Sequence, residues 1–180
     1  YGTGVTPQLV SSINGVNTAN TNWQDEVYSA AWTQNLSASI SNASEKGSYL
    51  FSANYINQNG LMDNTFYKRF TGRVNSTYNF SKYVRVGENL MVARWNNRGA
   101  DTNGDRGIPY SAMRQHPAIP VYSANGVFSD PSALLGSDID NPVQTLYNMR
   151  DNTNTSWRIF GNAYIEIMPI KGLTLKSNVG

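Results

Sequence analysis

The amino-acid sequence predicts an all-β fold built from about six antiparallel strands. Six runs alternate apolar with polar or small residues at a period of two; they span residues 33–43, 48–57, 69–80, 84–95, 154–168 and 173–179. No long amphipathic helix pattern interrupts them. Several runs have about 10 residues or more, longer than the usual length of about 5–6 for strands in globular proteins.

The elements follow in order along the chain. Residues 1–21 are rich in Gly, Thr, Ser and Asn, and we expect a loop there. Residues 22–28 are expected to form a short helix, with Asn22 as its N-cap and two acidic residues in its first turn. The polar turn Ser44–Gly47 joins the first two runs into a predicted β-hairpin, whose polar sides carry Ser and Asn rather than Lys and Glu.

The connections between the runs alternate strictly in length. Ser44–Gly47, Ser81–Tyr83 and Pro169–Gly172 are short, whereas the links at about 57–68 and 96–153 are long. A soluble antiparallel meander has no reason to keep this order, but outer-membrane barrels have short periplasmic turns and long extracellular loops. Strands of about 9–11 residues also have the length that a tilted strand needs to cross a bilayer. The sequence therefore predicts a segment of a transmembrane β-barrel.

This interpretation divides the chain into four parts of one barrel domain. Residues 1–32 would be an extracellular loop with a short helix, 33–96 four barrel strands, 97–153 a long extracellular loop, and 154–180 two barrel strands. Six strands are fewer than the minimum of about eight in known barrels. The chain also opens without a leader pattern and its final run ends without a partner, so we expect it to be part of a longer protein.

The alternation assigns one side of each strand to lipid. Aromatic residues near the ends of the runs suit an interfacial girdle; these are Trp95, Trp157, Tyr49, Tyr55, Tyr78 and Phe80. Arg73, Arg158 and Glu166 fall on polar sides, which would face the barrel lumen. The residues predicted to face lipid are Leu36, Ile40, Tyr49, Phe51, Tyr55, Val74, Ile159, Ile165 and Ile167.

Glu88 and Arg94 do not suit the apolar side of their run. Two explanations are open: either Gly87 makes a β-bulge that shifts the register, or both residues lie at the membrane edges.

Several function classes lack support in the sequence. The net charge is +2 with no basic run, which argues against a nucleic-acid partner. Cysteine is absent and His116 is the only histidine, so a thiolate metal site and a catalytic triad have no basis, and a packing or hydrogen-bonding role is expected for His116. No nucleophile elbow or phosphate-binding glycine loop is present, and we expect no enzyme and no cofactor.

One loop resembles the start of a calcium site. Asp101, Asn103 and Asp105 place oxygen-bearing side chains at alternate positions within residues 101–108. However, glycine is missing from the sixth position, and Ala112 stands where a bidentate glutamate is required. A polar surface turn is therefore expected, with calcium as the alternative.

The long loop has organisation of its own. Asn125-Gly126 lies between short apolar pairs within residues 119–128, which predicts a small hairpin. Asn141 followed by Pro142 predicts the start of a helix, with the asparagine as N-cap and the proline at the first helical position. A long loop that has structure of its own more often has a function than serves only as a connection.

A set of segments in order along the chain resembles the SusC/RagA class of TonB-dependent outer-membrane transporters of Bacteroidetes-type bacteria. They are NWQDEV (22–27), SEK (44–46) with YLFS (49–52), YINQNG (55–60), VGENL (86–90), MR (113–114) with PAIPVY (117–122), and GNAY (161–164) with PIKGL (169–173). The resemblance runs from about residue 22 to the end of the chain. Together these segments are specific, although each alone would be weak.

The resemblance implies a barrel of about 22 strands around a plug, with this chain supplying about six strands of its first half. It places the protein in the outer membrane of a Gram-negative bacterium, in contact with outer-membrane lipid. The implied function is import of oligosaccharide or peptide nutrients together with a SusD-like surface lipoprotein and the TonB–ExbB–ExbD energising complex. The residues expected to contact substrate or lipoprotein are Trp95, Arg98, Tyr110, Arg114, His116 and Tyr122.

The alternative is a soluble β-sandwich that binds carbohydrate. It would account for the alternation, the 12% of aromatic residues and the 14% of charged residues. It leaves the alternation of short and long links unexplained.

Overall fold

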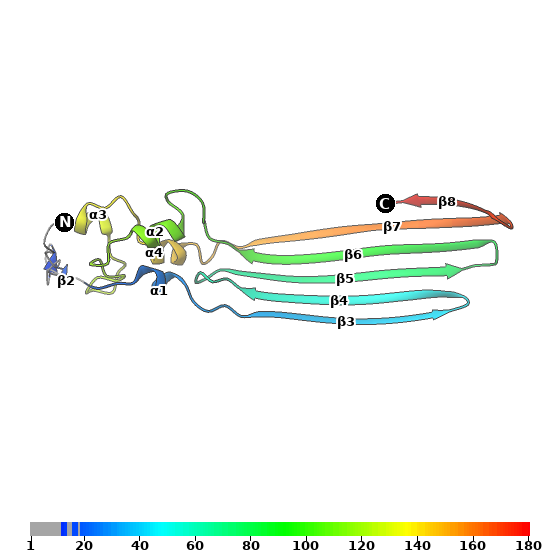
Figure 1. The fold of residues 1–180 in the computed structure, drawn as a ribbon, viewed down its shortest axis with the longest axis horizontal. Helices are drawn as coiled ribbons and strands as arrows, with labels where there is room; N and C mark the ends of the chain where they lie inside the picture. Colours follow the sequence, from blue (N-terminus) through cyan, green and yellow to red (C-terminus); the bar gives the residue numbers. More distant parts are fainter. Residues whose placement is uncertain (1–11, 14–15, 18) are drawn as a thin grey trace, which may run out of the picture. The chain divides into compact units, whose positions relative to one another are not determined.

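The computed structural model describes residues 12–13, 16–17 and 19–180, and the chain divides into two compact units (Figure 1). The first, here called the loop unit, comprises Tyr1–Ala31, Gly60–Thr65 and Arg98–Asn152. The second, the sheet unit, comprises Trp32–Asn59, Phe66–Asn97 and Thr153–Gly180. Residues 1–31 and 98–152 were predicted to lie in two separate extracellular loops. They belong to one compact unit, which the sequence did not predict.

The sheet unit is one six-stranded sheet in which every strand pairs with the next in the chain, in the order β3-β4-β5-β6-β7-β8. This confirms the predicted meander of six strands (Figure 1). The strands are β3 (Thr33–Ser44), β4 (Gly47–Asn59), β5 (Phe66–Asn79), β6 (Val84–Arg98), β7 (Asn154–Ile170) and β8 (Leu173–Val179). A separate two-stranded pair joins β1 (Ser12–Ile13) to β2 (Val16–Asn17).

The described residues thus contain a single large sheet, which does not fit the β-sandwich alternative because a sandwich needs two.

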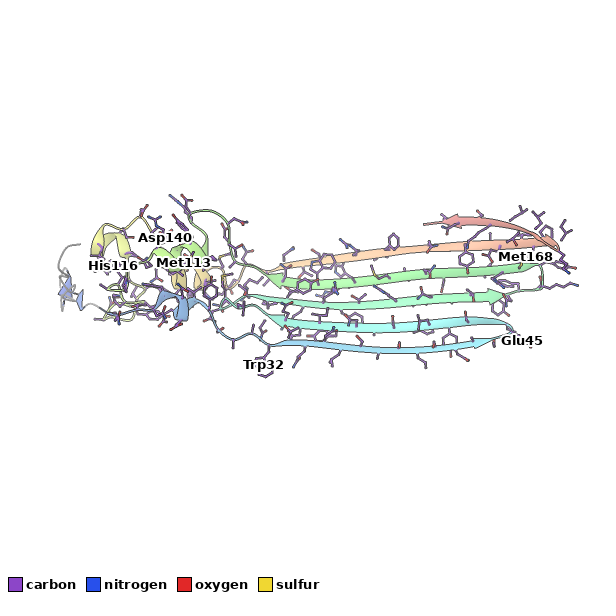
Figure 2. The ribbon with its side chains drawn as sticks, viewed as in Figure 1. Trp32, Glu45, Met113, His116, Asp140 and Met168 are labelled. Carbon is purple, nitrogen blue, oxygen red and sulfur yellow. The ribbon has the colours of Figure 1, made fainter. Side chains whose placement is uncertain are left out.

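Short turns close the sheet at one end. Only Glu45 and Lys46 separate β3 from β4, since Ser44 pairs directly with Gly47 (Figure 2). Gly47 has a φ of +151°, and a side chain there would collide with the carbonyl oxygen of Thr77 on β5. Residues 80–83 join β5 to β6, whereas 60–65 and 99–153 form the longer links. The alternation of short and long links therefore holds.

The strand pairing sorts the side chains onto two faces, because residues paired across antiparallel strands point to the same side. Ile40 pairs with Phe51, and Phe51 pairs in turn with Val74. The Ser76 hydroxyl on β5 donates to the Glu88 carboxylate on β6, so these two side chains lie on the same face of the sheet. All nine residues predicted to face lipid lie on this side, the apolar face: Leu36, Ile40, Tyr49, Phe51, Tyr55, Val74, Ile159, Ile165 and Ile167.

The apolar face is largely uncovered in this sheet. Leu36 is 65% exposed, Ile40 63% and Ile159 71%, which is unusual for large aliphatic side chains in a folded protein. Its contact with lipid stays a prediction.

The pairing corrects two expectations about β6. Glu88 and Arg94 lie on the apolar face, opposite Ala163 and Trp157, and pairing with β7 is continuous from Val84 to Asn97. A register shift at Gly87 is therefore wrong; the pairing of β7 with β8 instead shows a register shift between Ile167 and Ile170. Gly87 has another use: a side chain there would collide with the ring of Tyr164.

The second correction concerns Trp95. It pairs with Ser156 and so lies on the opposite side from Trp157, on the polar face rather than among the girdle aromatics. The polar face is the side that carries Ser37, Ser39, Ser41, Ser52, Asn54, Arg69, Thr71, Arg73, Trp95, Arg158 and Glu166.

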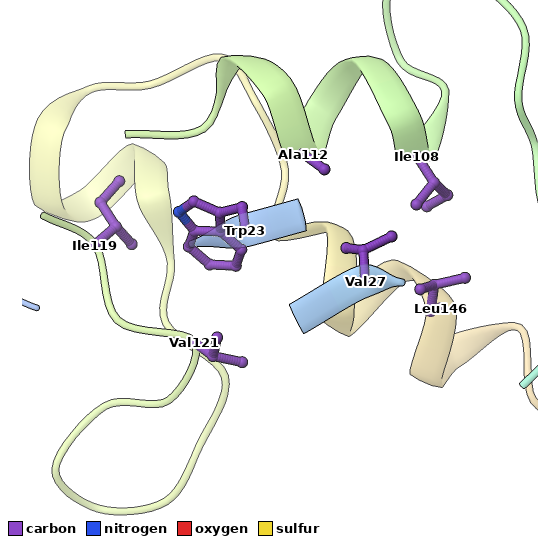
Figure 3. Packing of buried hydrophobic residues seen from close by; sticks show 7 residues of the cluster. All are labelled: Trp23, Val27, Ile108, Ala112, Ile119, Val121 and Leu146. Atoms are coloured by element: carbon purple, nitrogen blue, oxygen red, sulfur yellow. The ribbon is translucent and has the colours of Figure 1, made fainter. Parts of the chain in front are cut away.

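The loop unit has a small apolar core (Figure 3). Its helices are α1 (Trp23–Val27), α2 (Ile108–Arg114), α3 (Pro131–Leu135) and α4 (Pro142–Asn148). Helix α1 lies against α2 and α4. The core side chains are Trp23, Val27, Ile108, Ala112, Ile119, Val121 and Leu146.

Local capping matches the sequence prediction at one helix and not at another. Asn141 caps α4 as predicted, since its side-chain oxygen accepts from the backbone N–H groups of Val143 and Gln144. Asn22 occupies the N-cap position of α1 as predicted, but its side chain makes no cap hydrogen bond; its amide donates to the Asp25 carboxylate at 2.6 Å instead. Among the described helices, none has both the length and the apolar character to cross a membrane.

Candidate functional site

The polar face of the sheet is built from hydrogen-bonded amides and hydroxyls. The Asn54 amide on β4 donates to Asn35 Oδ1 at 2.7 Å and to Ser37 Oγ at 2.8 Å on β3. Across the other end of the sheet, Asn89 donates to Asn162, which donates to Asn178. These polar groups satisfy one another without charge, and across β3 and β4 this face is polar without any ionised residue.

The charges on this face fall into two groups. In the first, Glu166 is held between Arg85 at 3.5 Å and Lys176 at 3.1 Å, and its side chain is only 16% exposed. The Lys176 ammonium also lies 3.9 Å from the centre of the Tyr164 ring. The predicted polar-side position of Glu166 is confirmed, and its charge is matched by the two cations that contact it.

The second group is an arginine cluster around a hollow of about 340 Å³. Arg158 on β7 stacks over Trp95 on β6, with its guanidinium carbon 5.6 Å from the ring centre. Ala93, which pairs with Arg158, is buried, and its small side chain forms the bottom of the hollow. We call this the arginine hollow; it is lined by Tyr67, Arg69, Thr71, Arg73, Met91, Ala93, Trp95 and Arg158.

Of the six residues predicted to contact substrate or lipoprotein, Trp95 alone belongs to the sheet unit. Arg98, Tyr110, Arg114, His116 and Tyr122 all belong to the loop unit. Arg98 donates to the backbone oxygen of Asn64 at 3.0 Å, so it ties two segments of that unit together. Arg114 lies over the Tyr110 ring at 5.1 Å and 3.9 Å from Asp138.

His116 has the hydrogen-bonding role expected of it. Its Nδ1 accepts from the Ala118 backbone N–H at 3.1 Å, and its backbone oxygen accepts from the Trp23 indole N–H at 3.1 Å. The imidazole itself is exposed. His116 therefore shapes the turn that holds Ile119 in the core.

The loop unit also carries a row of aromatic side chains that the sequence did not predict. Tyr122 and Phe128 have ring centres 4.9 Å apart, Phe128 and Tyr147 5.4 Å, and the Arg150 guanidinium lies 3.9 Å from the Tyr147 ring. Tyr122 and Tyr147 are 51% and 46% exposed. The row joins two separate segments of the long loop. The sequence predicted only the turn at Asn125-Gly126, which brings Tyr122 close to Phe128.

That turn forms as a tight reversal rather than as a hairpin with strands. The Ser123 N–H donates to Val127 O at 2.8 Å, and a single bridge pairs Tyr122 with Phe128.

The loop that resembles a calcium site is a polar turn on the surface. Asp101 Oδ1 accepts from the Asn103 N–H at 3.0 Å, and the Ile108 N–H donates to Asp101 O at 2.8 Å. Among the described residues, no three His, Cys, Asp or Glu side chains gather in a way that could hold a metal ion. Calcium binding through Asp101, Asn103 and Asp105 stays an untested alternative.

Helix α3 provides a pH-dependent contact in the loop unit. The Asp130 carboxylate accepts from the Ser132 hydroxyl at 2.7 Å and from the backbone N–H groups of Ser132 and Ala133. The Ser132 hydroxyl, followed by the two N–H groups, holds the pKa of Asp130 below its usual value. A carboxyl with a lowered pKa stabilises the fold above its unfolded-state pKa, and this contribution is lost as pH falls through the folded-state value.

We therefore expect acidification to loosen α3. At acid pH, hydrogen exchange in residues 131–135 should increase relative to an Asp130→Asn variant at the same pH. Asparagine keeps the capping oxygen but does not titrate, so it removes the pH dependence while retaining the cap. Identical pH profiles for the two proteins would contradict this role of Asp130.

Comparison with known proteins gives consistent relatives. No protein-family model matches the chain. TonB-dependent receptor P3 of Formosa agariphila is 32% identical over 169 residues, covering 90% of this chain and 16% of that protein. TonB-dependent receptor SusC of Bacteroides thetaiotaomicron is 28% identical over 162 residues, covering 89% of this chain and 15% of SusC.

Solved structures agree on the fold. The RagAB peptide importer in its "closed-closed" state matches with a TM-score of 0.69 and 24% identity, over 92% of this chain and 19% of that one. A structure of the RagAB peptide transporter matches with a TM-score of 0.68 and 25% identity. The chain thus spans about one sixth of the length of the curated relatives that it matches.

Proposed function

This chain belongs to the SusC/RagA type of TonB-dependent receptors of the Gram-negative outer membrane, and we propose on that premise that it forms part of the wall of a nutrient importer. The cargo would be oligosaccharide or peptide. The proposal includes no covalent chemistry, because the relatives are receptors and importers rather than enzymes.

The observation that carries the proposal is the two-faced sheet. The six-stranded sheet presents an uncovered apolar face on one side and a face of amides, hydroxyls and arginines on the other. A transmembrane barrel needs this division, with apolar residues toward lipid and polar residues toward the lumen. Unpaired edges at β3 and β8 would be closed by further strands of the receptor, since the bilayer tolerates no open sheet edge.

The remaining partners are proposed from the family to which the chain belongs. A SusD-like surface lipoprotein would cover the extracellular mouth, and the TonB–ExbB–ExbD complex would supply energy through other parts of the receptor. A plug would face the polar side of the sheet. The loop unit supplies aromatic and basic groups suited to cargo or lipoprotein contact: Arg114, His116 and Tyr122 are exposed, and Tyr110 is half-buried. Trp95 and Arg98 are partly buried and serve this role less directly.

Growth of the native bacterium tests the proposal. We expect deletion of the gene for the whole receptor to abolish growth on a mixture of plant oligosaccharides or on a tryptic digest of casein. Growth on glucose and ammonium should be unchanged. Inactivation of the TonB motor should reproduce the defect, and the wild-type gene should restore growth. Normal growth of the deletion strain on both mixtures would contradict import of these nutrients.

A further inference from the structure

The arginine hollow offers three guanidinium groups with no carboxylate against them. Among the described residues, neither Arg69, Arg73 nor Arg158 has an ion-pair partner, and no acidic residue lines the hollow. We propose that this hollow binds an extended acidic peptide, so that the importer favours peptide cargo with carboxylate side chains. The proposal rests on the proposed function and deepens it by naming a class of cargo.

The charge balance of the polar face supports an anionic occupant. Glu166 is the acidic residue on this side of the described strands, and Arg85 and Lys176 already contact its carboxylate. The positive charge of the hollow is therefore not neutralised within the sheet. A ligand carboxylate would remove the mutual repulsion of the arginines and form charge-assisted hydrogen bonds with them.

Burial and stacking prepare the guanidinium groups for a ligand. The Nε atom of Arg69 is closed off by its surroundings yet has no hydrogen-bond partner in the described part of the chain. Buried polar atoms in native structures almost always find a partner, and a ligand carboxylate would supply one to this atom. Arg158 lies over the Trp95 ring, which restricts the plane of its guanidinium fork and lowers the entropy lost on binding.

The spacing of the arginines favours a peptide over other anions. Arg69 and Arg73 lie four residues apart on β5, with Thr71 between them on the same face. At about 3.3 Å per residue, the two Cα atoms are roughly 13 Å apart. In an extended peptide that lies along β5, Cα atoms four residues apart are separated by the same distance. Acidic side chains at that spacing would therefore meet both arginines. The Thr71 hydroxyl lies level with the peptide residue midway between them.

Binding to the purified full-length receptor tests the proposal. The probe is the blocked pentapeptide Glu-Ser-Gly-Ser-Glu, measured by titration calorimetry in detergent, with Gln-Ser-Gly-Ser-Gln as the neutral control. We expect the acidic peptide to bind at least about tenfold more tightly than the neutral one, with affinity falling as salt is raised. Arg73→Gln and Arg158→Gln should each weaken binding of the acidic peptide by about tenfold or more.

The matched control is Arg94→Gln. Arg94 also stacks on a tryptophan, with its guanidinium 5.4 Å from the Trp157 ring, but it lies on the apolar face. Its loss should leave peptide affinity unchanged. Equal effects of Arg94→Gln and Arg158→Gln would overturn the proposal, because they would point to a general charge effect.

Other outcomes also decide the question. Equal binding of both peptides by the wild-type receptor overturns the proposal, and so does tighter binding of a tetragalacturonate than of the acidic peptide. If no peptide binds while Arg73→Gln and Arg158→Gln lower the melting temperature, the arginines pair with carboxylates of the receptor itself, and the cargo assignment is wrong. The growth experiment is independent: an importer can pass it without acidic selectivity, whereas its failure removes the proposed function itself.

Discussion

Replacement of Ile40 by arginine should lower the free energy of unfolding of the full-length receptor in lipid by about 2–4 kcal/mol. Ile40 lies on the apolar face, is 63% exposed in this sheet and pairs with Phe51. In the proposed orientation its side chain lies in hydrocarbon, where a guanidinium loses its hydration and finds no partner. Chemical unfolding of the receptor in vesicles, followed by tryptophan fluorescence, measures the change.

Ser41→Arg is the matched control. Ser41 is the next residue of β3, belongs to the polar face and pairs with Leu50, away from the arginine hollow. An arginine there points to the lumen, where water or polar groups are available, so its cost should be less than about 1 kcal/mol. Equal destabilisation by the two substitutions would contradict the assignment of the apolar face to lipid. A larger effect of Ser41→Arg would reverse the orientation of the sheet.

The strands could be predicted because the pattern that specifies them lies within a few neighbouring residues of the sequence. The side-chain period of two appears directly in the sequence, and it assigned every predicted lipid residue to one face. The boundaries were less accurate where pairing extends a strand beyond its pattern. β5 begins at Phe66 rather than at residue 69, because Asn59 of β4 continues the ladder to that residue.

Properties that depend on register could not be read from single strands. The period of two already puts Trp95 on the side opposite Arg94, but only the pairing of β6 with β7 shows that Trp95 lies beneath Arg158. Arg73 and Arg158 were predicted to lie on polar sides, but their meeting with Arg69 in one hollow requires β5, β6 and β7 to be aligned. The sequence shows the charges and the structure shows which of them converge.

The loop unit was the least predictable part. Helices α2 and α3 have seven and five residues, too short for a 3.6-residue period to stand out. The segment between these two helices is held by contacts distant in sequence. The Thr21 N–H donates to Pro117 O at 2.8 Å, and the Thr21 hydroxyl donates to Ile119 O at 2.8 Å. Such pairings across the chain leave no local pattern.

Trp23 holds this unit together, and its replacement by alanine should cost the loop unit about 3–5 kcal/mol of stability. The ring is 2% exposed, packs in the core with Ile119 and Ala112, and donates its indole N–H to His116 O (Figure 3). Loss of the ring opens a cavity at the point where α1 meets the long loop. Hydrogen exchange of the full-length receptor should show faster exchange in residues 108–121 and 142–148.

Trp23→Phe separates packing from hydrogen bonding. Phenylalanine fills part of the cavity but cannot donate to His116, so its effect should be clearly smaller than that of alanine. Exchange within β3 to β8 should stay unchanged in both variants, because the sheet unit has its own backbone ladder and shares no side chain of this core. Faster exchange across the sheet in Trp23→Ala would show that the strands depend on the loop unit for their stability. Unchanged exchange in both units would show that the core around Trp23 does not stabilise the loop unit.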